Sequence, residues 1–119
     1  MHYRLEKNLK IMDELVIYCV KHGGRNIDLN ITFAEEFSLF SLTAEVDAIP
    51  QSDIDRISQM LNEERQYEIE ENYWMLGGDS ELQGESEMFL VGIMIDEATV
   101  TCSNGRLTIR AKRMEKNGD

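Results

Sequence analysis

LEKNLKIMDELVIYCVKHGG, residues 5–24, is the stretch that decides the fold. Its apolar residues recur at steps of four, three, four and three, which is the spacing of one face of an α-helix. We therefore expect a helix over residues 5–22 that buries this face in the core. Gly23 and Gly24 follow, and glycine ends helices because it adopts the left-handed conformation without strain. The predicted buried stripe consists of Leu5, Leu9, Met12, Val16 and Cys19, widened by Leu15, Ile17 and Val20.

Two β-hairpins are predicted further along the chain. Residues 26–33 and 37–46 alternate apolar and polar side chains, as strands do when one face of a sheet is in water. Asn104-Gly105 is the strongest short signal for a hairpin turn, and it lies between two further alternating runs. In each hairpin the apolar side chains share one face. The predicted cross-strand pairs are Ile31–Phe40 and Leu29–Leu42, then Cys102–Leu107, Val100–Ile109 and Ala98–Ala111.

The remaining elements complete an α/β (α+β) fold. Short helices are expected over residues 53–62, with Ser52 as N-cap, and over residues 64–76. Residues 88–95 carry no charge, and periodicity alone leaves helix and strand open there. The sum is a two-layer sandwich: a mostly antiparallel or mixed sheet of about four strands, covered on one face by helices. We expect one domain over residues 1–119, with residues 113–119 as a frayed tail.

The acidic residues are concentrated in one segment of the chain. The net charge is −11 over 119 residues; residues 63–97 hold eleven acids and one base, whereas residues 1–25 carry a net +2. A negative field of this size repels phosphate backbones, so nucleic acid is not an expected partner. With no apolar run long enough to span a bilayer and no leader sequence, we expect a cytoplasmic protein without a membrane partner. Cys19 and Cys102 match no metal-binding spacing and are expected as reduced thiols.

Three patches of sequence carry a resemblance. Residues 14–23 read ELVIYCVKHG, Val46-Asp47 ends the second strand, and residues 90–100 read LVGIMIDEATV before the last hairpin. With the order of elements, they resemble the ATP-binding domain of the histidine-kinase and anti-sigma-factor-kinase superfamily. Short Firmicutes proteins with Tyr-Trp and Asp-Glu-Ala-x-Val signatures are also similar, a resemblance that implies no function. The superfamily resemblance favours a helix over residues 88–95.

The same resemblance implies candidate site residues. Asp47 would read the adenine amino group, His22 would contact phosphate, and Gly78 would belong to the lid over the ATP. Glu14 would be the base that activates water in hydrolytic members. Each also has a structural interpretation: Glu14 as a helix-surface acid, His22 as a favourable charge at a helix C-terminus, and Asp47 as a turn cap.

The departures from the superfamily pattern shape the functional hypothesis. Tyr18 occupies the position of the asparagine that holds magnesium, and no glycine follows Asp47 to let the backbone approach adenine. We therefore expect a non-catalytic regulatory or protein-interaction module that needs no cofactor and no metal. The alternative is an anti-sigma-factor-type kinase with an altered site that still binds ATP and magnesium.

An acidic face offers a surface for a protein partner. Basic partners are expected to dock on exposed glutamates of residues 64–76, where aromatic residues are either interface anchors or core. Homo-oligomerisation through this helix or through an edge strand is a further possibility. The candidate partner contacts are Glu64, Glu68, Glu71, Tyr73 and Trp74.

Overall fold

The structure, a computed structural model, describes the backbone of residues 3–75 and 87–115 and the side chains of residues 3–71 and 88–115. These residues form four helices and four strands in the order α-β-β-α-α-α-β-β. The elements are α1 (Arg4–Lys21), β1 (Arg25–Phe33), β2 (Phe37–Glu45), α2 (Gln51–Leu61), α3 (Tyr67–Met75), α4 (Glu87–Met94), β3 (Glu97–Ser103) and β4 (Arg106–Met114).

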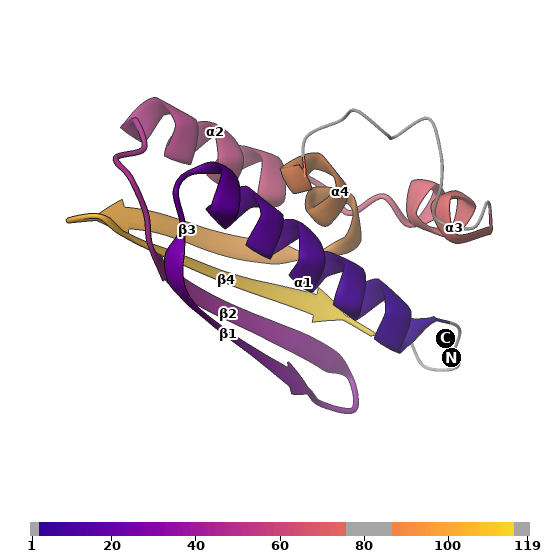
Figure 1. The fold of residues 1–119 in the computed structure, drawn as a ribbon. Coiled ribbons are helices and arrows are strands. Elements are labelled where there is room, and N and C mark those ends of the chain that lie inside the picture. Colours follow the sequence, from indigo (N-terminus) through magenta and orange to yellow (C-terminus); the bar gives the residue numbers. More distant parts are fainter. Residues whose placement is uncertain (1–2, 76–86, 116–119) are drawn as a thin grey trace.

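The strands form one antiparallel sheet in the order β1-β2-β4-β3. Figure 1 shows α1, α2 and α4 on one face of this sheet, with α3 beyond its end and the other face without a helix in the described part of the chain. The prediction of a two-layer α+β sandwich with a four-stranded sheet is therefore confirmed. No described helix is long and apolar enough to cross a membrane.

Both predicted hairpins form with the predicted registers. Ile31 lies opposite Phe40 in the first hairpin, and Val100 lies opposite Ile109 in the second. At the second turn, Asn104 and Gly105 have φ values of 54° and 75°, the left-handed pair that matches the twist of the flanking strands. The long central strand β4 joins the two hairpins by pairing with β2.

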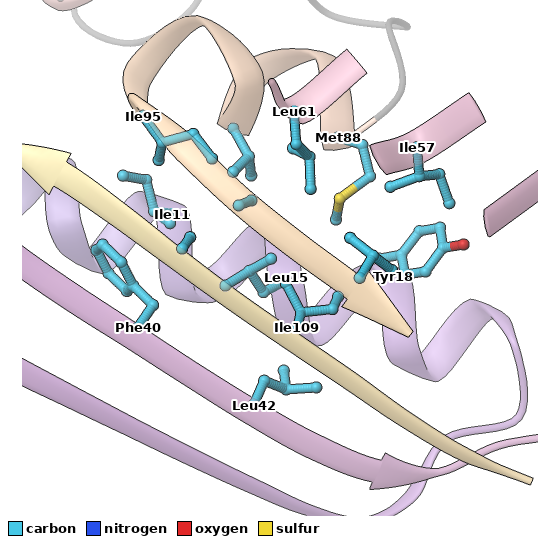
Figure 2. Packing of buried hydrophobic residues seen from close by; sticks show 14 of the residues in the cluster. Ile11, Leu15, Tyr18, Phe40, Leu42, Ile57, Leu61, Met88, Ile95 and Ile109 are labelled. Carbon is cyan, nitrogen blue, oxygen red and sulfur yellow. The ribbon is translucent and has the colours of Figure 1, made fainter. Parts of the chain in front are cut away.

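The hydrophobic core lies between the sheet and the helices. Figure 2 shows side chains of α1, α2 and α4 meeting those of β2 and β4 between the two layers. Gly92 of α4 lies against α2, where an added Cβ would come within 2.9 Å of the Met60 carbonyl oxygen. The largest fully buried apolar side chains are Ile11, Leu15, Phe40, Leu42, Ile54, Leu61, Met88, Met94, Ile95, Leu107 and Ile109.

The face of α1 that enters the core differs from the predicted stripe. Leu5 and Leu9 are 55% and 44% exposed, whereas Leu15 and Cys19 are buried as predicted. Ile11 and Tyr18, which were not in the predicted stripe, complete the core face of α1. The helix is apolar on two neighbouring sides, so helical spacing alone fits either side. In the folded protein, the side of α1 that packs on the sheet is the one that also carries the buried polar residues Lys7 and Asn8.

The other three helices can be compared with their predictions. Helix α2 begins at Gln51 after Pro50, and no side chain caps it, so the prediction of Ser52 as N-cap is wrong. Helix α3 begins three residues later than predicted, at Tyr67. Residues 88–95 are mostly helical, in α4, as the resemblance favoured.

The predicted frayed tail begins too early. Strand β4 continues to Met114, and both Arg113 and Glu115 are buried. Arg113 continues the inward alternation of Ile109 and Ala111, and its charge is matched by carboxylates in the interior. Residues 116–119 lie outside the described residues.

Candidate functional site

The C-terminal end of α1 brings two predicted nucleotide contacts together. The backbone N–H of Asp47 donates to the carbonyl oxygen of His22 at 3.0 Å, which ties the segment after β2 to the helix end. The Asp47 carboxylate covers Gly23, where an added Cβ would come within 2.2 Å of Oδ2. Arg25 Nη1 donates to Asp47 Oδ1 at 3.2 Å and to the Gly23 carbonyl at 2.6 Å. These contacts are sufficient to explain an aspartate here as part of a helix end.

Glu14 and Tyr18 lie on the buried side of α1, two turns and one turn before His22. Glu14 is 8% exposed and pairs with Lys10 Nζ at 3.0 Å, so its interpretation as a surface acid is wrong. Tyr18 packs in the core (Figure 2), with its ring centroid 4.5 Å from that of His22. Burial, and then the charge of Asp53, raises the pKa of Tyr18 to about 12. A neutral phenol buried in this way is a packing group.

Three further predicted site residues lie wholly or partly outside the described residues. Gly78 lies outside the described residues, and so do the side chains of Tyr73 and Trp74. The roles predicted for them stay predictions.

A buried ionic cluster, which the sequence interpretation missed, lies beside α3. It draws together side chains from α1, from the connection before α3, from α3 and from the end of β4, all at most 9% exposed. We call this group the ionic cluster; it consists of Lys7, Arg65, Glu70, Arg113 and Glu115.

Glu70 is the centre of the ionic cluster. It is 2% exposed, and its carboxylate contacts Lys7 Nζ at 2.9 Å, Arg113 Nη2 at 2.9 Å and Arg65 Nη2 at 3.1 Å. Burial by itself raises the pKa of Glu70, but the charge and hydrogen bond of Arg113, together with Arg65 and Lys7, lower this pKa below the ordinary value of a glutamate overall. Glu70 is therefore an ionised carboxylate that fixes α3 to the rest of the molecule.

Glu115 extends the cluster toward β2. Its carboxylate accepts hydrogen bonds from Ser38 Oγ at 2.7 Å, from Arg113 Nε at 3.2 Å and from Asn8 Nδ2 at 3.3 Å. On the other side, Arg65 Nη1 donates to Asp96 Oδ2 at 3.0 Å. The buried charges are thus satisfied by opposite charges and hydrogen bonds, as buried charges must be.

Two sequence signals could have located this cluster. Lys7 precedes the core residues Ile11 and Leu15 by four and eight positions, which places it on their helical face. Arg113 shares the two-residue alternation of Ile109 and Ala111, which points it inward. Glu70, by contrast, follows Ile69 in an acidic run and gives no such signal. The expectation of exposed glutamates over residues 64–76 is wrong for Glu70, which is buried.

The connection into α3 forms an acidic hollow of about 530 Å³. We use "acidic hollow" for the surface lined by Glu63, Glu64, Arg65, Gln66, Tyr67, Glu68 and Ile69. The predicted partner contacts Glu64 and Glu68 both lie here and are exposed. Glu71 is not among the lining residues: its side chain is 54% exposed and is ion-paired with Lys7.

A second hollow, of about 600 Å³, lies mainly over the face of the sheet without helices. Its lining includes Arg110 and Lys112 of β4, flanked by Ser41 and Thr99, with Glu97 nearby. Lys112 Nζ lies 4.9 Å from the centroid of the Phe37 ring. None of the predicted site residues lies in this hollow.

The described side chains include no group of three or more His, Cys, Asp or Glu residues that could hold a metal ion. No known protein family matches the sequence, and a comparison with curated proteins finds no match either.

Proposed function

We propose that the chain is a non-catalytic protein-interaction module that binds a basic segment of a partner protein at the acidic hollow. The observation that carries the proposal is the grouping of Glu63, Glu64 and Glu68 around one hollow, next to the exposed ring of Tyr67. Carboxylates with an adjoining aromatic surface suit the charged head and the apolar stem of lysine or arginine.

The single base in the hollow does not neutralise these acids. Arg65 is 9% exposed, and its guanidinium pairs inward with Glu70 and Asp96. Its flat face lies 4.3 Å from the centroid of the Tyr67 ring, so it supports the aromatic wall from within. Within the described residues, the outward field of the hollow therefore comes from glutamates, which steers basic partners toward it.

The ionic cluster makes the hollow a preformed surface. Arg65 lies within the hollow and Glu70 follows its last residue in sequence, and both are held by buried ion pairs. A backbone fixed at these two points loses little conformational entropy when a partner binds. The backbone that carries the acids of the hollow is thus already ordered.

The contacts at the end of α1 favour this function over adenine-nucleotide binding. Tyr18 packs in the core at the superfamily's magnesium-binding position, and the Asp47 carboxylate is engaged with Arg25. A relationship to the ATPase scaffold of histidine kinases and anti-sigma-factor kinases is part of the proposal. It is supported by the order of elements and by residues 14–23, and such a likeness of fold does not carry function.

The test is calorimetric titration of the protein with a lysine-rich peptide at low salt. Glu64→Gln/Glu68→Gln removes two charges from the hollow, and Glu35→Gln/Asp55→Asn removes two exposed charges elsewhere as a charge-matched control. Exposed ion pairs contribute up to about 1 kcal/mol each, so the hollow variant should bind roughly three- to thirtyfold more weakly. Equal affinity of the two double variants would show that only net charge matters and would refute the proposal.

A further inference from the structure

The side of α1 that faces away from α3 carries an apolar stripe, bordered by the exposed Asp13. Its residues recur at steps of four, three, four and four, which places them in one row along the helix. Three of them are 44% to 58% exposed, and the other two are half-buried. We call the row the outer stripe; it consists of Leu5, Leu9, Met12, Val16 and Val20.

The outer stripe lies toward the β1 side of the molecule. Lys7 reaches α3 from the opposite side of the helix, because it is displaced by about half a turn from Leu9 and Val16 on the helical wheel. In Figure 1, α3 and α4 lie to one side of α1, and β1 forms the far margin of the sheet. The inward side chains of β1 are only half-buried at Leu29 and Ile31, so an apolar surface continues from the helix to the strand.

Among the described residues, strand β1 is an edge of the sheet, and part of its backbone has no strand to pair with. The hydrogen bond from Ala34 N–H to the Phe37 carbonyl shows which residues of β1 bond to β2. In an antiparallel pair every second residue bonds to the partner strand, so Thr32 and Asn30 face β2 as Ala34 does. The backbone N–H and C=O groups of Leu29, Ile31 and Phe33 therefore point away from β2.

At the opposite edge of the sheet, strand β3, backbone groups are bonded by a side chain. On β3, the Asn62 side chain accepts from the Ala98 N–H at 3.0 Å and donates to the Ala98 carbonyl at 2.8 Å. Helix α2 also lies beside that strand. Unpaired edges invite pairing with another strand, and β1 is the edge that the described structure leaves open.

We propose that β1 pairs antiparallel with β1 of a second copy of this chain, so that two four-stranded sheets join into one. A two-fold axis perpendicular to the sheet keeps both α1 helices on the same face. Their outer stripes then face each other across the junction. The same interface thus covers the apolar outer stripes and supplies hydrogen-bond partners for the outward backbone groups of β1.

The charge distribution makes this the surface at which two copies repel each other least. The net charge of −11 opposes contact between copies over most of the chain, but residues 1–25 are nearly balanced at a net +2, and β1 contains one acid, Asp28. An antiparallel register centred on Asn30 places Asp28 opposite Thr32 of the other copy, so no acid faces another acid. The proposal is independent of the acidic hollow, which lies at α3.

The test is sedimentation equilibrium of the full chain at roughly 100 µM, where a micromolar dimer is saturated. The wild type should sediment with twice its mass of 13.8 kDa. Ile31→Lys places charges near each other across the dyad and should raise the dissociation constant at least about tenfold. Leu39→Lys, at an exposed position on the interior strand β2, is the matched control and should leave the dimer intact.

A double variant of α1 and a hydrogen-exchange measurement test the proposed dimer interface independently. Leu9→Lys/Val20→Lys changes only exposed side chains, so it should fold and should also weaken the dimer. Hydrogen exchange at the Leu29, Ile31 and Phe33 amides should slow as protein concentration rises. A wild type that sediments at 13.8 kDa at this concentration would overturn the proposal, and so would a dimer that the β1 and α1 variants leave unchanged.

Discussion

Replacing the buried Glu70 by glutamine should destabilise the fold far more than the same change at an exposed acid of α3. The variant keeps the size of the side chain and removes the charge that Lys7, Arg65 and Arg113 share. It also turns an amide NH₂ toward at least one cation. Removing one partner of a buried ion pair costs about 3–5 kcal/mol, because the remaining charges stay buried and uncompensated.

That loss is large against the total stability of a chain of 119 residues, about 6–18 kcal/mol by the usual per-residue range. It corresponds to a fall in Tm of roughly 10–20 °C. Chemical denaturation followed by circular dichroism measures it. Two variants serve as controls. Glu68 is exposed, so the unfolding free energy of Glu68→Gln should stay within about 0.5 kcal/mol of the wild type. The Glu71 side chain is 54% exposed, so Glu71→Gln should lower the unfolding free energy by at most about 1 kcal/mol.

The pH dependence provides a separate check on Glu70. Because its folded-state pKa is lowered, its ionised form contributes stability that is fully present above the unfolded-state pKa. That contribution is lost as pH falls through the folded-state pKa. The difference in unfolding free energy between the wild type and Glu70→Gln should therefore be constant near neutral pH and shrink below about pH 4. A loss under 1 kcal/mol at pH 7, or a difference that does not change with pH, would refute the account of the ionic cluster.

Three further changes test the packing. Cys19 is buried, which raises the pKa of its thiol to about 11, so a thiol reagent should modify the half-buried Cys102 first in the native protein and both thiols in denaturant. Gly92→Ala should destabilise the fold by about 1–3 kcal/mol, because the added Cβ meets the α2 backbone; an unchanged denaturation midpoint would contradict that contact. Asn62→Ala should speed hydrogen exchange at the Ala98 amide while leaving the amides of β4 protected.

Short-range patterns were enough to predict the two hairpins of the sheet. Hairpin registers follow from local turns and two-residue alternation, so Ile31–Phe40 and Val100–Ile109 could be predicted from the residues themselves. The face of α1 could not, because Leu5 and Ile11 are equally apolar and only the packed sheet selects between them.

The sequence indicates that Lys7 and Arg113 face inward, but it does not identify the carboxylates that pair with them. Glu70 contacts residues 63 positions before it and 43 positions after it, and no local pattern encodes such partners. The contacts within the candidate site were likewise not encoded in a local sequence pattern. His22 and Asp47 were predicted to belong together and do meet, but their contact is made by the backbone at a helix end. Glu64 and Glu68 were predicted as exposed partner contacts, and both line the acidic hollow.

The most direct test of the proposed function is an amide NMR titration of the isotopically labelled protein with a lysine-rich peptide, and in parallel with ATP and magnesium. The account predicts peptide-induced shifts concentrated over residues 63–69, weakened in Glu64→Gln/Glu68→Gln, and no response to the nucleotide at Tyr18, His22 or Asp47. Saturable nucleotide shifts at the end of α1, with peptide shifts spread evenly over the acidic surface, would contradict it.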